Sequence, residues 1–506
     1  MRKLIREWRM TDGVCRLLLA ACCLLPATPL SAQSASLQKR VDARLDTAPF
    51  NRQLWGVALV DEKGKLLYGR NADRMFVPAS NTKIVVSAVA AALFDPDFTV
   101  RTSLYGSGPV INGVLQGDLV LYGRGDPTFS QRCYAIDTTV AGACDTVPRQ
   151  KLDDLAAQLA RAGIRSVSGD VVGDGSWFEP LLVHPAWENY DLNWWYAAPV
   201  SGLGYNDNSI DIKYSTSDTV GPPVTLIFAP DFGDVTLENR TRTVARGEDE
   251  TIDFYRTAGT LSVWAQGNVE AGRKPRTESF ALPDPDMFAA RALRAALAAR
   301  GIAVMGDTRS TTDSMAYEIV RRGTPLAEVT SRPLKDWIFP ILNTSQNWYA
   351  EMVLKQLGKA FGQGGSWDEG IKVERRFLID SVGVDSTQIA LSDGSGLSAS
   401  NLVSPLAFTQ VLRFIRRHPR WSTFAAGLPQ SGNTGSLRNR FKGTPLDGKV
   451  RAKTGSISRV NSLSGFIELD GGKGVVFSVQ ANHHTQPTRA ILAEIDSVVV
   501  DMARGR

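Results

Sequence analysis

Hydrophobic and polar positions predict helical and hairpin structure in the first hundred residues. Residues 36–45 have helical character, and residues 54–68 alternate in two short runs around the turn at 61–64, which indicates a β-hairpin. Residues 84–93 run apolar, rich in Ala and free of Gly and Pro, as a buried helix would. We therefore expect a helix and a hairpin, followed by a buried helix.

From about residue 105 to residue 315, short alternating runs separated by Gly-rich turns predict mainly β structure. An aromatic cluster at 187–205 is interpreted as core packing rather than as a sugar-binding platform, because large aromatic side chains mostly fill cores. Residues 105–315 contain enough apolar residues to form hydrophobic cores of their own, so we expect one or two inserted domains. Strands are expected at 100–105, 117–128 and 166–174 and throughout 209–268, with helices at 152–163 and 287–300.

After residue 326 the pattern returns to helices and then closes with a hairpin and a last helix. The chain as a whole therefore predicts an α+β multidomain protein. Helices are expected at 333–342, 348–361, 371–382, 405–417 and 488–502, and the hairpin strands at 460–469 and 474–480.

The composition is that of an ordinary globular protein of about three domains. The chain has 506 residues, of which 43% are hydrophobic and 22% charged. The formal net charge is +5, and removing the predicted leader described next leaves about +2, with no block of Lys or Arg. This balance predicts neither a nucleic acid nor an anionic membrane surface as partner.

The N-terminus has the pattern of a secretory signal peptide over residues 1–32. Basic residues precede an apolar run at 17–25 that is too short to span a membrane, and small residues follow it. We expect cleavage after Ala32 or Ala35 and a periplasmic protein, with peripheral membrane association as an option. The alternatives are a short N-terminal core helix and a lipoprotein, since Leu-Ala-Ala-Cys ending at Cys22 resembles a lipobox.

Two cysteines, Cys133 and Cys144, remain after the leader is removed. Outside the cytosol such a pair predicts one disulfide, which would close a loop of about ten residues. The four histidines and the cysteines do not have the spacing of a zinc site. We therefore expect no metal and no cofactor.

Residues 78–83 form the first of three motifs that could carry chemistry. They place Ser80 at the start of the buried helix and Lys83 one turn later, within reach of the Ser80 hydroxyl. A serine needs a base before it can act as a nucleophile, and a lysine can be that base if burial or nearby positive charge keeps it partly neutral. Taken alone, a Ser before an apolar helix is more often a plain N-cap.

The other two motifs lie far downstream. Ser345 and Asn347 fall between two predicted helices, and Lys453, Thr454 and Gly455 are predicted to open a strand just before the final hairpin. Ser-x-x-Lys, Ser-x-Asn and Lys-Thr-Gly in this order resemble the signature of penicillin-binding proteins and class A β-lactamases. Lys-Thr-Gly alone would be an ordinary strand start.

The spacing of the motifs narrows the resemblance. Roughly 260 residues separate Lys83 from Ser345, far more than in β-lactamases or the simpler carboxypeptidases. The chain therefore resembles the low-molecular-mass class C penicillin-binding proteins, the D-alanyl-D-alanine carboxypeptidase/endopeptidase family. Gln346 departs from the Asp that is common in the family, which concerns tuning of the site rather than its chemistry. Further matches lie at 117–128, 198–201 with 206–208, 393–398 with Asn401, and 428–437 with Arg440.

The resemblance also implies a fold. It predicts a transpeptidase-like catalytic domain of the penicillin-binding-protein and β-lactamase type, with an antiparallel sheet flanked by helices and mainly β inserted domains. Residues 36–104 and 316–506 would form the two parts of the catalytic domain. Residues 105–315 would form one inserted domain or, as the favoured interpretation, two nested and β-rich ones.

Four residues are implied as catalytic. Ser80 would form an acyl-enzyme, Lys83 would accept its proton, and Ser345 with Lys453 would relay a proton to the departing D-alanine. Because Lys453 is expected beside Lys83, its positive charge would help to keep Lys83 neutral.

Asn347, Thr454, Gly455 and Ser456 are implied as substrate-binding residues. Gly455 has no side chain, which would let the substrate backbone lie against this strand as an added strand. The backbone N–H groups of Ser80 and Ser456 are expected to form the oxyanion hole.

The implied partners are peptidoglycan stem peptides as substrates and β-lactams as covalent inhibitors. The way the inserted domains shape the cleft would decide between carboxypeptidase and endopeptidase activity, and no pattern predicts an oligomeric state. Two other functions are compatible with the same residues. One is a β-lactamase or esterase on this scaffold, and the other is a non-catalytic wall-binding protein.

Overall fold

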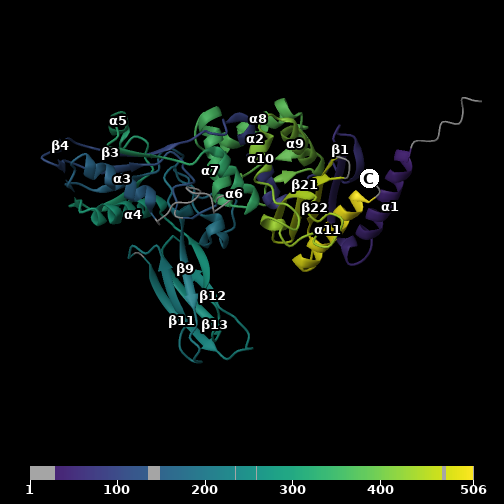
Figure 1. Ribbon diagram of the computed structural model, residues 1–506, viewed down its shortest axis with the longest axis horizontal. Coiled ribbons are helices and arrows are strands. Elements are labelled where there is room, and N and C mark those ends of the chain that lie inside the picture. The colour runs from purple at the N-terminus through teal and green to yellow at the C-terminus, as the bar shows by residue number, and fades with distance from the viewer. Residues whose placement is uncertain are drawn as a thin grey trace, which may run out of the picture.

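The computed structural model describes residues 29–130, 132–134, 149–233, 235–257, 259–469 and 474–504. Figure 1 shows the segments nearest the two ends of the chain, purple and yellow, on one side of the molecule. The middle of the chain, blue to teal, forms the other side and a lobe that extends from it.

The strands nearest the two ends of the chain form one antiparallel sheet. It contains β2 (Leu66–Arg70), β1 (Leu54–Asp61), β22 (Gly474–Asn482), β21 (Val460–Glu468) and β20 (Val450–Ile457), in that order. β1 pairs with β22 along its whole length, so the two predicted hairpins lie side by side although they are far apart in sequence. This order leaves β20 at an edge of the sheet.

Helices cover both faces of this sheet, which explains why β1, β21 and β22 are buried almost throughout. On one face, α1 (Pro29–Leu45) and α11 (Thr488–Ala503) share a core with Trp55 and Leu463. The other face packs against a helical layer through Phe466 and Val476. That layer contains α2 (Thr82–Leu93), α6 (Leu334–Asn343), α7 (Asn347–Phe361), α8 (Trp367–Phe377), α9 (Pro405–Arg417) and α10 (Trp421–Ala425).

The middle of the chain forms a second unit around a mixed sheet. In order, its strands are β16 (Thr308–Thr311), β8 (Val171–Asp174), β6 (Leu119–Tyr122), β3 (Arg101–Gly106) and β17 (Ala327–Thr330). A smaller sheet contains β15 (Ala303–Val304), β7 (Ser166–Val167), β5 (Val114–Leu115) and β4 (Val110–Ile111). Two helices, α3 (Gln150–Arg161) and α4 (Pro285–Ala299), contribute leucines and alanines to the core of this unit.

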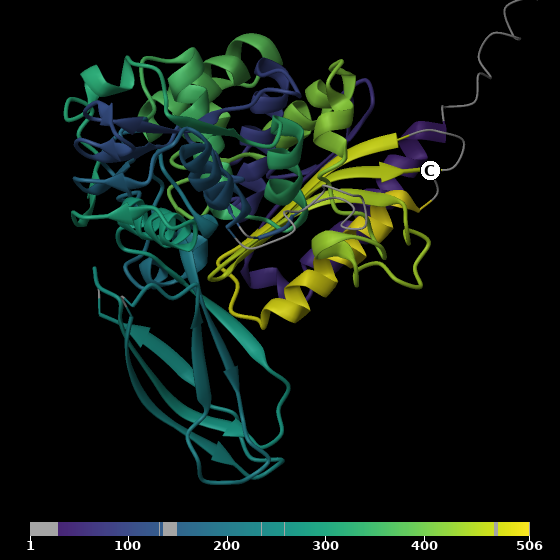
Figure 2. The ribbon, with the colours of Figure 1, turned by 60° about the vertical axis from the view of Figure 1, so that its left-hand side comes forward.

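Two three-stranded sheets make up the lobe, which Figure 2 shows projecting from the second unit. One contains β10 (Thr225–Ala229), β9 (Ser209–Ser215) and β14 (Arg276–Ala281). The other contains β11 (Thr236–Val244), β13 (Ser262–Glu270) and β12 (Asp253–Arg256), and in it β11 and β13 run parallel. The remaining α-helix and strands are α5 (Glu318–Arg321), β18 (Ile389–Ala390) and β19 (Leu402–Val403).

The observed elements depart from the predicted ones at a few places. The single strand predicted at 166–174 is two strands, β7 and β8, in different sheets. The turn between them requires Gly169, since a Cβ there would lie 2.6–2.7 Å from the backbone of Gly117. The helix predicted at 371–382 begins earlier, at Trp367, where the Ser366 side chain accepts a hydrogen bond from the backbone as an N-cap.

The mixed sheet extends past both ends of the predicted inserted section. It includes β3, which begins at Arg101, and β17, which lies at 327–330. Residues 105–315 therefore lie within a larger unit that starts and ends nearer to the catalytic motifs.

Most of the predicted leader and one cysteine lie outside the described residues, while residues 29–32 of the leader belong to α1. Residues 1–28 belong to the predicted signal peptide, and Cys144 belongs to the predicted disulfide. Cys133 is disulfide-bonded, and its pairing with Cys144 stays a prediction. Among the described residues, no helix has both the length and the apolar character needed to cross a membrane.

Candidate active site

Ser80 lies in a tight turn that packs against the central sheet. The turn η2 (Ala79–Asn81) is a 3-10 helix that runs directly into α2, so Ser80 lies just before the helix that it was predicted to open. Asn81 Nδ2 donates a buried hydrogen bond to Ser464 Oγ on β21 (2.7 Å). Because this bond is shielded from water, it holds the turn firmly on the sheet.

Lys83 is completely buried, and its Nζ atom lies among three oxygens. It donates to Ser80 Oγ at 2.9 Å, to Asn347 Oδ1 at 2.7 Å and to the carbonyl oxygen of Ser395 at 2.6 Å. The predicted nucleophile and base are therefore in hydrogen-bond contact. The three acceptors match the three donors of an ammonium group, so the charged form is accommodated as well as the neutral one.

Burial lowers the pKa of Lys83 to about 7, against the partly opposing charges of Asp393 and Glu351. Lys83 can therefore be neutral near physiological pH, as a general base must be. Burial, one of the two reasons considered from the sequence, is the main cause, and the expected contribution of the Lys453 charge is not among the causes of the shift. The charge of Lys83 instead adds to burial in holding the pKa of Lys453 well below its usual range.

Ser345 connects α6 to α7 and contacts the second lysine. Lys453 is fully buried, and its Nζ donates to Ser345 Oγ at 2.9 Å and to the carbonyl oxygen of Thr454 at 2.8 Å. Ser345 has φ of +64°, a left-handed conformation that is costly for a residue with a Cβ. Its hydroxyl is thus directed at Lys453 by a backbone that the surroundings must hold in place.

Asn347, at the start of α7, links Lys83 to the middle unit. Its Oδ1 accepts from Lys83, while its Nδ2 donates to the carbonyl oxygen of Tyr196 at 2.7 Å. The second bond fixes which end of the amide faces Lys83. The side chain thereby bridges the catalytic helices and a segment of the middle unit.

β20 presents the predicted substrate-binding residues along the edge of the sheet. Lys453 lies in the middle of this strand, not at its start as predicted. The N–H of Ala452 points away from β21 and donates to Pro429 (3.1 Å). Since these directions alternate with a period of two, the N–H groups of Thr454 and Ser456 face the same edge. The Thr454 hydroxyl donates to Ser436 Oγ at 2.9 Å.

Gly455 is required for a different reason from the one inferred from the sequence. A Cβ at this position would lie 2.5 Å from the carbonyl oxygen of Pro78 and 2.2 Å from Ser462 Oγ. Ser462 Oγ itself donates to Pro78 at 2.6 Å. The missing side chain therefore makes room for the Ser80 turn and does not open space for a substrate.

One contributor to the site, Glu351, was not singled out from the sequence. Glu351 on α7 is fully buried and accepts from the backbone N–H groups of Gly394 (3.0 Å) and Ser395 (2.7 Å), which places the Ser395 carbonyl on Lys83. Burial, together with the charge of Asp393, raises the pKa of Glu351 to about 7. The Asp393–Ser398 match signalled this loop, but a glutamate in a helix carries no signal of its own because most lie on the surface.

The arrangement suits acyl transfer. Ser80 and Lys83 form a nucleophile and base, Ser345 and Lys453 form a second hydroxyl–amine pair, and β20 supplies N–H donors at the edge of the sheet. Among the described residues, no group of three or more His, Cys, Asp or Glu side chains could hold a metal ion.

Replacement of Gly455 by Ala tests whether the Ser80 turn depends on this glycine. The added methyl would push the turn away from β20, and we expect a loss of about 1–3 kcal/mol in the free energy of unfolding together with slower modification of Ser80 by a β-lactam. Denaturant unfolding and acylation kinetics measure the two effects.

Gly364→Ala is a matched control for this variant. No atom lies within 4 Å of a Cβ at Gly364, so stability and acylation should stay close to wild type. If Gly455→Ala behaved like Gly364→Ala, the packing argument would be wrong.

Comparison with known proteins agrees with this geometry. Residues 37–501 match the model of the D-Ala-D-Ala carboxypeptidase 3 (S13) family. The D-alanyl-D-alanine carboxypeptidase of Actinomadura sp. (strain R39) is 31% identical over 95% of this chain and 88% of its own. The crystal structure of penicillin binding protein 4 from Haemophilus influenzae, 24% identical, superposes with a TM-score of 0.76 over 91% of this chain and 98% of that chain. The same Haemophilus protein complexed with a β-lactam gives a TM-score of 0.71 at 23% identity, covering 92% of this chain and 98% of that chain.

These matches confirm the α+β multidomain fold and the family inferred from the motifs. The chain belongs to the S13 family of serine D-Ala-D-Ala carboxypeptidases.

Proposed function

We propose that Ser80 cleaves the terminal D-Ala-D-Ala bond of peptidoglycan stem peptides through an acyl-enzyme. The observation that carries the proposal is the pair of contacts beside the edge of β20, from Lys83 to Ser80 and from Lys453 to Ser345. Ser80 and Lys83 carry out the attack on the carbonyl carbon, and Ser345 and Lys453 protonate the departing amine.

In the acylation step, Ser80 Oγ attacks the carbonyl carbon of the penultimate D-alanine and its proton passes to neutral Lys83 Nζ. The new C–O bond produces a tetrahedral intermediate with a negatively charged oxygen. The backbone N–H groups of Ser80 and Ser456 stabilise this oxygen. Because Lys83 has a pKa of about 7, a large fraction of the enzyme holds it as a free base at neutral pH.

The intermediate collapses when the C–N bond breaks and the nitrogen of the terminal D-alanine takes a proton from Ser345 Oγ. Lys453 replaces that proton through its hydrogen bond to Ser345. Thr454 and Lys453 receive the terminal carboxylate, which adds negative charge to the pocket and favours the protonated form of Lys453.

Water then attacks the ester carbonyl, its oxygen stays on the acyl group, and one of its protons goes to Ser80 Oγ as the C–O bond breaks. Loss of the proton held by Lys83 and gain of one by Lys453 complete the cycle. A β-lactam enters by the same attack on its ring carbonyl, but its leaving nitrogen stays attached to the acyl group. We therefore propose that β-lactams inhibit the enzyme as slowly released adducts on Ser80.

Covalent labelling and product release together test the function. Incubation with a labelled penicillin should add one adduct to the peptide that contains Ser80, and a D-Ala-D-Ala-terminated pentapeptide should release D-alanine. Ser80→Ala should abolish both, with a loss of at least about 10⁴-fold in turnover. Mass spectrometry and a D-alanine assay give the two readouts.

Failure to label Ser80 would reject the acyl-enzyme. Rapid hydrolysis of the penicillin would instead favour a β-lactamase, and absence of D-alanine release from an intact protein would favour a wall-binding role. Digestion of a cross-linked muropeptide dimer alongside the pentapeptide measures any endopeptidase activity.

The pH dependence of acylation tests the role of Glu351. The rate should rise through about pH 7 as Lys83 loses its proton. The negative charge of Glu351 favours the ammonium form, so Glu351→Gln should lower the pKa of Lys83 and move the acid limb to lower pH, by on the order of one unit. Stopped-flow acylation across pH 5–9 would locate the limb.

Glu374→Gln serves as the control for this shift. Burial raises the pKa of Glu374 well above its usual value. The charge of Glu374 is not among the causes of the pKa shift of Lys83, so its replacement should leave the limb in place. An unmoved limb in Glu351→Gln would show that Glu351 does not act on Lys83.

We propose further that the protein is exported to the periplasm and that its leader is removed. The support is the basic and apolar pattern of residues 1–32. Expression in a Gram-negative host should give periplasmic protein that begins at Gln33 or Ser36, and replacing Leu18 and Leu19 by Arg should keep the chain in the cytoplasm. N-terminal sequencing of the two fractions decides this, and lipid attached to Cys22 would favour the lipoprotein alternative.

A further inference from the structure

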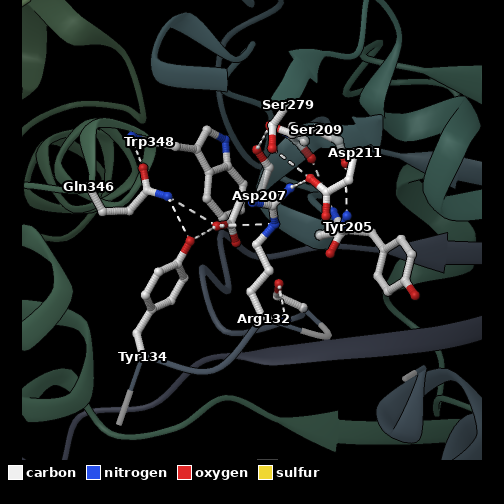
Figure 3. Close-up of polar contacts among 12 residues, drawn as sticks. Arg132, Tyr134, Tyr205, Asp207, Ser209, Asp211, Ser279, Gln346 and Trp348 are labelled. Atoms are coloured by element: carbon white, nitrogen blue, oxygen red, sulfur yellow. Dashed lines mark hydrogen bonds and ion pairs between the residues drawn. The ribbon is translucent and has the colours of Figure 1, made fainter. Parts of the chain in front are cut away.

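Gln346, the middle residue of the Ser-x-Asn motif, belongs to a buried polar network that reaches the middle unit (Figure 3). Its Nε2 donates to Asp207 Oδ2 at 3.0 Å and to Tyr134 Oη at 3.1 Å, and its Oε1 accepts from the N–H of Trp348 at 3.1 Å. Gln346 and Asp207 are each 2% exposed. The amide is thus used at both ends, as an N-cap of α7 and as a donor to a carboxylate.

Asp207 collects donors from several elements. Tyr134 Oη donates to the same Oδ2 at 2.5 Å, and Arg132 Nε lies 3.8 Å away. Arg132 also donates to Asp211 on β9 at 2.5 Å, so the network continues to the base of the lobe. Burial raises the pKa of Asp207, and the charge of Arg132 opposes this rise. The titratable groups around Asp207 are Arg132, Tyr134, Asp211 and Tyr349.

The start of α7 is tied to the middle unit at three successive residues. Besides the bond from Gln346 to Asp207, Asn347 Nδ2 donates to Tyr196 and Trp348 Nε1 donates to Pro199 (3.0 Å). Each bond leaves the helix from a side-chain nitrogen and ends on segment 196–207. This segment therefore sets where α7 begins.

The residue just before this clamp is Ser345, which has φ of +64°. A left-handed serine persists where its neighbours fix it from both sides. The carboxylate that fixes Gln346 is itself held in an unusual backbone, since Asn206, Asp207 and Asn208 all have positive φ and are buried. The same packed contacts therefore hold the backbones of Ser345 and Asp207 in their left-handed conformations.

We propose that Asp207 is a positioning residue for the catalytic serine Ser345, acting through a matched carboxylate–amide pair with Gln346. The pair holds the turn that directs Ser345 Oγ at Lys453 Nζ. An acidic residue at 346 would place a second carboxylate against Asp207, so the amide of Gln346 is the partner that this chain requires. The inference rests on the proposed role of Ser345 and Lys453 as the proton relay.

Gln346→Glu is the sharpest test because it keeps the length of the side chain and its contact with the N–H of Trp348. The donor to Asp207 becomes a carboxylate oxygen, and repulsion should displace the turn. Since a misplacement of about 1 Å can cost about 10²-fold in rate, we expect kcat for D-alanine release at pH 8 to fall by about 10- to 100-fold with little change in KM. The ratio of variant to wild-type activity should increase as the pH falls, because one shared proton relieves the repulsion.

A second substitution distinguishes the pair from general disruption. Asp207→Asn keeps an acceptor for Tyr134 and supplies an amide that can donate to the carboxylate introduced at position 346. The double variant that combines Gln346→Glu with Asp207→Asn should therefore recover most of the lost activity and lose the abnormal pH dependence. Asp211→Asn is the matched control, since it alters the Arg132 contact without touching Gln346, and it should give no recovery in the same background.

Asp207→Ala covers the case in which Gln346→Glu does not fold. It removes the acceptor without adding repulsion, and it should lower kcat without the altered pH profile while thermal unfolding remains cooperative. Wild-type kcat in a folded Gln346→Glu, or equal recovery by Asp207→Asn and Asp211→Asn, would overturn the proposal. Ser345→Ala separates failure of the proposed relay from failure of the positioning pair. If Ser345→Ala keeps full activity, the proposed relay is wrong. If Ser345→Ala loses activity and Gln346→Glu does not, only the positioning pair is refuted.

Discussion

Burial of the Lys83 ammonium is the constraint around which the catalytic unit is organised. A lysine that is removed from water must find a hydrogen-bond partner for each donor, or give up its charge. Lys83 does both, since three oxygens from separate segments surround Nζ and its pKa falls to about 7. Those segments are the Ser80 turn, the start of α7 and the loop at 393–398, so the three must assemble together before any one of them has its final geometry.

Each segment that meets Lys83 is fixed by a second buried contact. The Ser80 turn is held on β21 by Asn81 and packs closely on Gly455. The loop that carries Ser395 is held by the carboxylate of Glu351. Because these partners are shielded from water, losing one leaves a buried polar group unsatisfied, which costs more than the bond itself contributes. The reacting groups therefore sit on supports that have few alternative arrangements.

The middle unit takes part in this support. Segment 196–207 accepts hydrogen bonds from the first residues of α7, among them Asn347, whose oxygen faces Lys83. A unit that lies between two catalytic motifs in the sequence thus packs in space against the motif that follows it. Its lobe projects away from the sheet (Figure 2), while its base is continuous with the site through Arg132 and Asp207.

The sequence by itself determined the family, the motif residues and most of the elements. Periodicity identified both hairpins and the buried helix after Ser80, since one-turn spacing and alternation are local properties. One-turn spacing predicted the contact from Lys83 to Ser80, and the family resemblance carried by three short motifs implied the contact from Lys453 to Ser345. The tertiary structure decided what depends on long-range packing. It showed that Gly455 makes room for the Ser80 turn rather than for a substrate, and that Lys453 lies within β20. It also brought Glu351 and Asp207 to the site. It also decided the cause of the lowered pKa of Lys83, because desolvation comes from every segment that covers a group, and no stretch of sequence contains that information alone.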